Sequence, residues 1–335
     1  MGRYGKGMIE TTVHSKNPVS VESTMCDELS RSDASAQSVV PILRHLLASD
    51  DNSLFSDEIV ARVRGMVGAL ALQLLEAMAA VESEGECVAK IEEFDHEDAS
   101  IAALTSTFIG NTAFLRHIHA LAVEWQFTER LQSRLALDPV VSPLLQANIA
   151  SASAELSALA MKLLASQARF CQTQRRMHLP LLELPGDMLN VVLDGLMAVS
   201  AGDASSEKCA AAACEAIRAS HDDATTRLGL IARLLSGMGG GATEALSVTQ
   251  AGPAIFLSAL AMGSGQDRAA AVLSTNEVQM ARLALALRAA GLKPSVVEEQ
   301  FFALHPDIAL PEGFERLGAD RAAAILAVGD GYPGG

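Results

Sequence analysis

The sequence predicts an all-α protein, an irregular array of helical hairpins packed around one long central helix. Half of the 335 residues are apolar, which is enough to fill a core. Aromatic residues make up only 4% of the chain, and β-branched residues form no alternating runs bounded by turn residues. The expected helices differ in length and show no fixed repeat, so an ankyrin or tetratricopeptide array is not supported. A solenoid-like stack is one form that such an array can take.

The central helix is predicted over residues 143–178. Ser142 is suited to cap its start, with Pro143 at the first helical position, and Pro180 prevents the helix from continuing. The apolar stripe expected to be buried comprises Leu145, Ile149, Ala152, Leu156, Leu159 and Leu163. Shorter helices on both sides can pack against this long surface.

Composition divides the chain into four parts. Residues 1–36 mix glycine, serine, threonine and isolated charges without periodicity, so a flexible N-terminal tail is predicted. A main helical domain follows at 37–236. The glycine-rich stretch 237–241 separates it from a C-terminal helical subdomain at 242–328, and 329–335 forms a loose tail.

Each helix of the main domain has a local signal for its start or end. Ser56 is suited to cap a helix that runs to about Val81, because two acidic residues follow it. Gly110 interrupts the pattern, and Thr112 is expected to cap a helix with a long apolar stripe reaching Leu135. The other helices of this domain are expected near 38–48, 98–108, 187–200, 206–219 and 222–236.

The sequence of the last third of the chain predicts short helices. Ser274 and Glu277 have the spacing of a capping box, whereas Gly291 followed by Pro294 marks a helix end. The helices are expected near 253–262, 266–273, 276–290, 295–304 and 313–327.

Charge and cysteine content restrict the function. The net charge is −15 and no segment is basic, which disfavours nucleic acids and anionic membranes as partners. Five cysteines without a CxxC pair indicate a reducing compartment, and the N-terminus lacks the apolar core of a signal peptide. A soluble cytoplasmic protein is therefore expected. The glycines of 237–241 lack the strand, lysine and hydroxyl residue of a phosphate loop, and no cofactor is predicted.

The strongest charge feature is the stretch 82–98, where eight acidic residues accompany the single base Lys90. Within it, the run from Asp95 to Asp98 places carboxylates beside His96, the groups used in metal binding and acid–base chemistry. Adjacent residues diverge around a helix, however, and an ordinary solvated helix start is the favoured interpretation.

The polar side of the central helix carries a second candidate site, made of Arg169, Gln172, Arg175 and Arg176. Guanidinium groups bind carboxylates and phosphorylated partners through paired hydrogen bonds. These residues can equally pair with the acidic segment 82–98 of the same chain, and this second interpretation is favoured.

The following segment, Leu179 to Pro185, is apolar but cannot form a regular helix, because each of its two prolines pushes its predecessor toward extended geometry. We expect it to lie in a groove on the protein or on a partner. Leu181 and Leu182 are its candidate partner-binding residues. The segment is also the first candidate for self-association, since the stripe of the central helix is too short for a coiled coil and should be buried in the monomer.

The residues 167–170 and 174–177, followed by the two Leu-Pro steps up to Pro185, resemble an uncharacterised family of bacterial helical proteins, a domain of unknown function. A fainter resemblance to the same family extends from residues 256–260 to residues 289–292. The resemblance implies helices and no known activity.

These features favour a non-enzymatic, cytoplasmic helical protein that acts as a protein–protein interaction scaffold or regulator. Its expected partner is another protein, and the chain itself is expected to be a monomer or a weak homo-oligomer. The alternative is an enzyme whose metal or acid–base site is assembled from distant helices and includes the acidic residues 92–98. A nucleic-acid adaptor is a third and more distant alternative.

Overall fold

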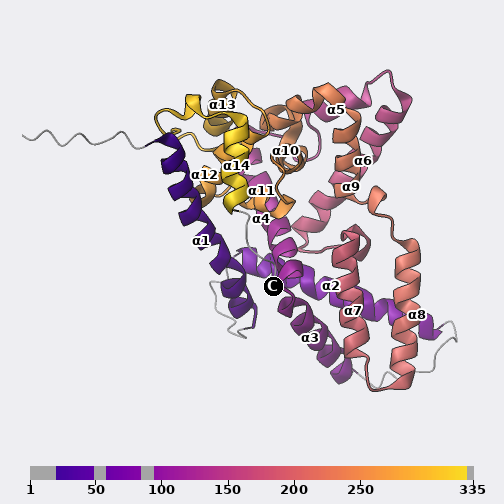
Figure 1. The fold of residues 1–335 in the computed structure, drawn as a ribbon. Coiled ribbons are helices and arrows are strands. Elements are labelled where there is room, and N and C mark those ends of the chain that lie inside the picture. The colour runs from indigo at the N-terminus through magenta and orange to yellow at the C-terminus, as the bar shows by residue number, and fades with distance from the viewer. Residues whose placement is uncertain (1–19, 49–57, 84–93, 330–335) are drawn as a thin grey trace, which may run out of the picture.

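The computed structural model describes residues 20–48, 58–83 and 94–329, and every regular element in these ranges is helical, which confirms the all-α prediction (Figure 1). The α-helices are α1 (Val21–Ala48), α2 (Glu58–Ser83), α3 (Phe94–Gly110), α4 (Thr112–Leu135), α5 (Pro143–Ile149), α6 (Ala154–Arg175), α7 (Gly186–Val199), α8 (Ala204–Ser220), α9 (Arg227–Gly237), α10 (Val248–Ser264), α11 (Arg268–Leu273), α12 (Met280–Ala289), α13 (Pro294–Leu304) and α14 (Ala319–Gly329). Short 3₁₀ turns η1 (Leu181–Glu183), η2 (Asp223–Thr225), η3 (Gly239–Leu246), η4 (Glu277–Gln279) and η5 (Phe314–Arg316) connect them.

Helix α4 occupies the centre of the molecule and takes the place predicted for the 143–178 helix. It is buried on most sides between Phe114 and Leu131, and it contacts α1, α2, α3, α6, α7, α10 and α11. A helix with apolar side chains on most of its sides needs neighbouring helices on those sides to shield them from water. The other helices therefore group around α4.

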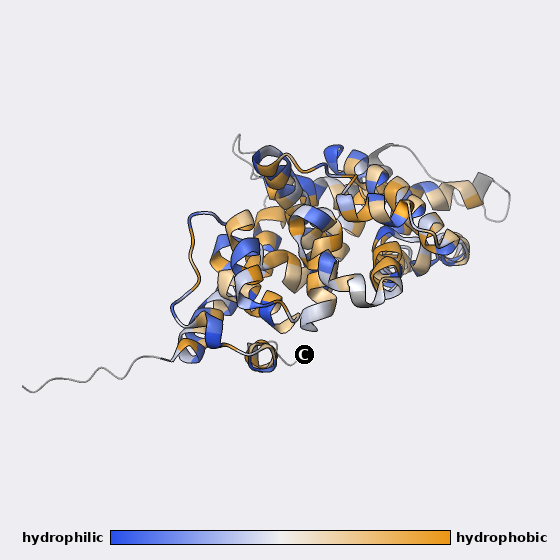
Figure 2. Ribbon diagram, turned by 90° about the horizontal axis from the view of Figure 1, so that it is seen from above, coloured by the Kyte–Doolittle hydropathy of each residue, from blue (hydrophilic) through white to orange (hydrophobic). Residues whose placement is uncertain are grey.

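Two hydrophobic clusters lie on opposite sides of α4. The first joins Val123 and Phe127 of α4 to α5, α6 and the helices from α9 to α14. The second joins Leu115 and Trp125 of α4 to α2, α3, α7 and α8. Figure 1 shows these two groups of helices, and most helices in Figure 2 carry both a hydrophobic and a hydrophilic side. The predicted boundary at 237–241 separates α9 from η3, and both of these contribute to the first cluster.

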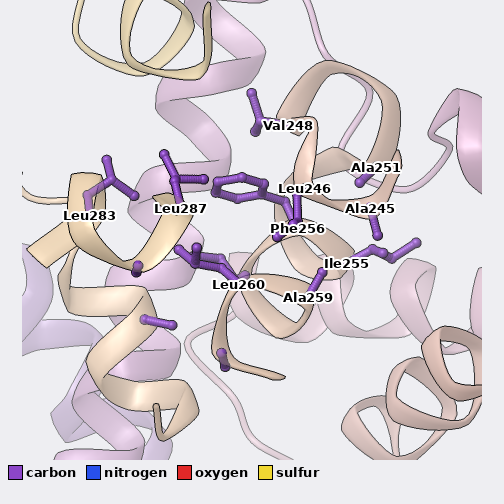
Figure 3. Packing of buried hydrophobic residues seen from close by; sticks show 14 of the residues in the cluster. Ala245, Leu246, Val248, Ala251, Ile255, Phe256, Ala259, Leu260, Leu283 and Leu287 are labelled. Carbon is purple, nitrogen blue, oxygen red and sulfur yellow. The ribbon is translucent and has the colours of Figure 1, made fainter. Parts of the chain in front are cut away.

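The first cluster is densest around α10. Phe256 is fully buried, and its ring lies between Leu246 of η3 and Leu287 of α12 (Figure 3). Leu260, one turn further along α10, is also buried. The C-terminal helices thus pack on α10 on one side of α4. Helices α2, α3, α7 and α8 pack together on the other side.

The prediction of one continuous helix over 143–178 is wrong. Helix α5 ends at Ile149 and α6 begins at Ala154, with four residues between them. Serine hydroxyls stabilise this break: Ser153 accepts a hydrogen bond from the Leu156 amide, and Ser157 donates one of 2.6 Å to the Ile149 carbonyl. Serines that bond to nearby backbone groups compete with helical hydrogen bonds, which an apolar stripe does not reveal.

Other expectations for this region hold. Ser142 caps α5 by accepting a hydrogen bond from the Leu145 amide, and Pro143 occupies the first turn. Leu163 is buried in the first cluster as expected, whereas Leu156 is only half-buried at its edge.

The prediction of a flexible tail over residues 1–36 is wrong for the part that the structure describes. Residues 21–36 form the first half of α1, where Met25 and Leu29, four apart, are buried in the first cluster. Asp33 forms an ion pair of 2.6 Å with Arg282 of α12. Asp33 and Arg282 are some 250 positions apart in the sequence, so no local sequence pattern predicts this contact. Residues 1–19 lie outside the described ranges.

Two predicted caps differ in the structure. Asn111, not Thr112, caps α4, because its side chain accepts from the Phe114 amide at 2.9 Å. Ser274 ends α11 and does not begin a capping box. Gly291, with φ of 92°, and Pro294 at the start of α13 mark a helix end as predicted. Ser56 and the tail 330–335 lie outside the described residues.

Helix α2 is the one helix in the described ranges that is long and apolar enough to cross a membrane by length and composition. Its residues Val63, Met66, Leu70 and Leu74 are completely buried in the second cluster, and it contacts α3, α4 and α8. Burial of one complete face against neighbouring helices is typical of a core helix.

Helix α10 contains a sharp kink at Gly252. Its φ of 72° and ψ of 167° lie in a region that only glycine adopts readily. A Cβ atom at this position would also be 3.2 Å from Cβ of Ser142. The kink lets the start of α10 pack against the start of α5.

We predict that Gly252→Ala lowers the free energy of unfolding by about 2 kcal/mol or more, because the new side chain is strained by the backbone and crowded by Ser142. Gly68→Ala is the matched control. Gly68 is helical and nothing would lie within 4 Å of its Cβ, so this change should be neutral or stabilise by up to about 1 kcal/mol. Urea unfolding of both variants measures the difference, and equal effects would contradict the strain at Gly252.

Candidate functional site

A hollow of about 550 Å³ lies where the end of α6, the Leu179–Glu183 segment and the start of α9 meet over α4. We call it the α6 groove. Leu121, Phe170 and Leu179 supply apolar walls, and His117 and Arg227 supply polar ones. This volume falls in the range of sites that take small ligands or the side chains of a bound peptide.

The groove exists because the chain turns sharply after α6. Met177 adopts a left-handed φ of 52°, and the His178 amide donates to the Thr173 carbonyl at 2.9 Å. The turn lies directly against Gly65 of α2, where any Cβ atom would be 2.8 Å from Cβ of Met177. Gly65 therefore sets how closely the end of α6 approaches α2.

The segment after the turn is fixed by Gln73 of α2. Its side-chain amide donates to the Leu179 carbonyl at 2.9 Å and accepts from the Leu181 amide at 2.9 Å. This pairing directs Leu181 into the second cluster, where it is 6% exposed, and leaves Leu182 44% exposed at the groove. The segment has extended geometry on both sides of a single 3₁₀ turn, as its prolines predict.

The structure brings together four of the six residues predicted to bind a partner. Arg169, Gln172, Arg176 and Leu182 line the groove; Arg175 is exposed outside it, and Leu181 is buried.

The guanidinium groups of Arg169 and Arg176 make no ion pair or hydrogen bond to any residue that the structure describes. The other predicted partner of these arginines was the acidic segment 82–98, whose side chains from 82 to 97 lie outside the described residues. Asp98 is exposed. Both arginines are themselves exposed to solvent at the rim of the groove.

A buried ion cluster supports the groove from below. Glu124 of α4 is completely buried and accepts two hydrogen bonds from Arg227, at 2.8 and 3.0 Å. Arg268 of α11 donates a third, at 2.9 Å. The Arg227 guanidinium also stacks on the Phe170 ring, 3.6 Å from its centroid. Three helices and a wall of the groove are thus fixed to a single carboxylate.

The charge of Glu124 is set by its two partners. Burial alone raises the pKa of a carboxyl group, but Arg227 and Arg268 outweigh it and lower the pKa of Glu124 to about 2. The carboxylate is therefore ionised at every physiological pH, and the cluster of two arginines and one glutamate carries one net positive charge.

The start of α9 is occupied by a carboxylate of the chain itself. Glu183 accepts a hydrogen bond of 2.8 Å from the Arg227 amide, and Thr226 caps the helix by accepting from the Gly229 amide at 3.1 Å. Negative charge at a helix N-terminus is favourable. This contact connects the Leu-Pro segment to α9 and closes one end of the groove.

His117 lies between the groove and a smaller hollow of about 370 Å³ near the starts of α7 and α11. Burial, together with the nearby charges of Arg268 and Arg227, lowers its pKa to about 4. The imidazole is consequently neutral at pH 7. His117 and His119 lie on different sides of α4, as their spacing predicts, since His119 borders a separate hollow.

Two observations on the described residues concern metal binding and thiol chemistry. No three histidine, cysteine or acidic side chains gather there in a way that could hold a metal ion. The side chains of Asp95, His96 and Glu97 lie outside this description. Burial raises the pKa of the Cys171 thiol to about 11, so this buried sulfur stays protonated.

Sequence analysis did not identify Glu124, Arg227 or Arg268. A signal was present for Glu124, because it precedes Trp125 within the most apolar part of a predicted core helix. A charged residue at such a position needs a buried partner. The sequence does not show which arginine meets it.

Comparisons of the chain with known protein families, with curated proteins and with solved structures found no match. The resemblance around residues 167–185 stays a prediction.

We predict that Glu124→Ala destabilises the protein by about 3 to 5 kcal/mol, because it leaves the buried Arg227 and the partly buried Arg268 without their carboxylate. Glu215→Ala is the control. Glu215 is exposed on α8, and its removal should change the free energy of unfolding by less than about 0.5 kcal/mol. Chemical denaturation of the two variants measures both values, and a loss below 1 kcal/mol for Glu124→Ala would show that the cluster matters little for stability.

We also predict that His117 makes stability depend on pH between 6.5 and 4. Over this interval the unfolded chain binds a proton at His117 that the folded chain excludes, so the free energy of unfolding falls as the pH is lowered. In His117→Gln this fall should be smaller, by about 1 to 3 kcal/mol between pH 7 and pH 4. Glu124 contributes a separate loss only below about pH 4.5. Unfolding curves across the pH series test this, and parallel curves for the two proteins would contradict it.

Proposed function

We propose that this protein is a non-enzymatic interaction module of the cytoplasm, a scaffold or regulator that binds another protein through the α6 groove. The observation that carries the proposal is the pair Arg169 and Arg176. Both guanidinium groups are exposed at the groove, beside the exposed Leu182, without an ion-pair partner among the described residues.

This arrangement favours a partner segment that combines a carboxylate with an apolar side chain. Arginine binds carboxylates through two parallel hydrogen bonds, and Leu182 with the apolar walls offers a place for the neighbouring side chain. The whole chain carries a net charge of −15, so its long-range field repels an acidic partner. Recognition of the partner then depends on Arg169 and Arg176. Such charge pairs contribute more to the specificity of binding than to its affinity.

Hydrogen bonds and ion pairs hold the backbone and walls of the groove in place. Gln73 fixes the backbone on both sides of Pro180, Glu183 ties the segment to α9, and the Glu124 cluster holds Arg227 against Phe170. A surface that is already ordered loses less conformational entropy on binding. These contacts support a preformed docking site.

The experiment is a selection from a random peptide library displayed against the full chain. We expect enrichment of peptides with Asp or Glu next to a large apolar residue. Their affinity should fall about tenfold or more in the double variant Arg169→Glu with Arg176→Glu, because both changes place a like charge opposite the peptide carboxylate.

Arg175→Glu is the matched control, since Arg175 is an exposed neighbour that does not line the groove. It should retain the affinity within about threefold. Selected peptides that bind the double variant as tightly as the parent protein, or a selection without an acidic and apolar motif, would contradict the proposal.

A further inference from the structure

A second hollow, of about 660 Å³, lies beneath α1, on the side of α4 that faces away from the α6 groove. We call it the α1 cavity. Its walls come from α1, from the first two turns of α4 and from the segment that leads from α10 through α11 to α12. Figure 1 shows α1 running beside α12 and α14 to the end of α3.

Among the described residues, the walls carry three guanidinium groups and two carboxylates. Arg116 forms an ion pair of 2.6 Å with Asp267, and Arg282 forms one of 2.6 Å with Asp33. The fifth group, Arg44, has neutral acceptors alone among the described residues. It donates to the carbonyls of Ile109 and Gly110 at 3.1 and 3.2 Å and to the Thr112 hydroxyl at 2.9 Å.

The described walls of the α1 cavity therefore carry one more arginine than carboxylate, with His119 left aside, in a chain whose net charge is −15. The lysine and arginine residues among these described walls are all arginines, whose planar group matches a carboxylate. Paired charges at Arg116 and Arg282 neutralise each other. The excess resides at Arg44.

The remaining described walls are partly apolar, and they also include the polar residues Gln37, Thr112, His119 and Gln279. Ala36 and Val40 of α1 and Ala270 and Leu273 of α11 contribute apolar side chains to the cavity. A site of several hundred Å³ with apolar walls and a few charged groups is typical of small-molecule binding. An inorganic anion would leave the apolar part of this volume unfilled.

We propose that the α1 cavity binds a small organic anion that has one carboxylate and a short apolar body. The carboxylate pairs with Arg44, and the apolar body lies between α1 and α11 along Ala36, Val40 and Leu273. This proposal does not depend on the function proposed for the α6 groove, because the two sites share no lining residue.

The probe is octanoate, titrated into the full chain and followed by saturation-transfer NMR, with inorganic phosphate as the anion that lacks an apolar body. We expect saturable binding of octanoate and at least tenfold weaker binding of phosphate. Arg44→Gln removes the charge-assisted bonds and should weaken octanoate about tenfold.

Three further variants separate the site from its surroundings. Ala36→Trp fills the cavity from α1 and should abolish binding even if Arg44→Gln disturbs the contact between α1 and α3. Arg31→Gln changes an exposed arginine of the same helix that pairs with Glu28 outside the cavity, and Arg169→Gln changes the α6 groove. Both should leave octanoate affinity within about twofold.

Circular dichroism melts confirm that each variant is folded before it is titrated. The proposal is overturned if octanoate fails to bind the parent protein at millimolar concentration, or if Ala36→Trp binds it unchanged. If Arg169→Gln lost octanoate binding while Ala36→Trp retained it, octanoate would bind in the α6 groove. That result would also overturn the proposal.

Discussion

The buried contact of Glu124 with Arg227 and Arg268 is the constraint on which the centre of the structure depends. A carboxylate without exposure to water is tolerated only with partners that compensate its desolvation. Here the partners come from α9 and α11, so the position of α4 relative to both helices is fixed by charge as well as by apolar packing. The same arginines reach the α6 groove and the smaller hollow beside it. Stability of the core and shape of the surface are coupled through one side chain.

Helix α4 separates two sites of different character. The α6 groove is open at a rim of arginines that have no ion-pair partner among the described residues. The α1 cavity lies under a helix whose charges are mostly paired. Thr112 and Arg116 face the cavity, whereas Leu121 faces the groove. Because one helix contributes to both walls, a displacement of α4 that opens one site must alter the other.

The sequence was sufficient to predict most of the helices but not how they pack against one another. Apolar stripes with period 3.6 predicted α2 and α4 well, because burial of one face leaves a local pattern. The break between α5 and α6 was missed because two serines stabilise it through backbone contacts that do not disturb the stripe. The sequence predicted Arg169, Gln172 and Arg176 from the polar side of a helix, and Leu182 from an apolar segment that cannot be helical. The structure places all four along the α6 groove. Glu124 and its arginines, 103 and 144 positions away, could not be paired without the fold.

The long-range contacts of α1 also determine the order in which this chain can be completed during synthesis. Glu22 pairs with Arg321, 299 positions later, and the Ser32 hydroxyl donates to the Val278 carbonyl, 246 positions later. The first half of α1 therefore leaves the ribosome early but finds its partners only when nearly the whole chain has emerged. Until then Met25 and Leu29 remain without their apolar neighbours, which exposes the nascent protein to association or chaperone binding. Docking of the first half of α1 thus requires the last helices of the chain, and pairing between segments distant in the sequence is slow.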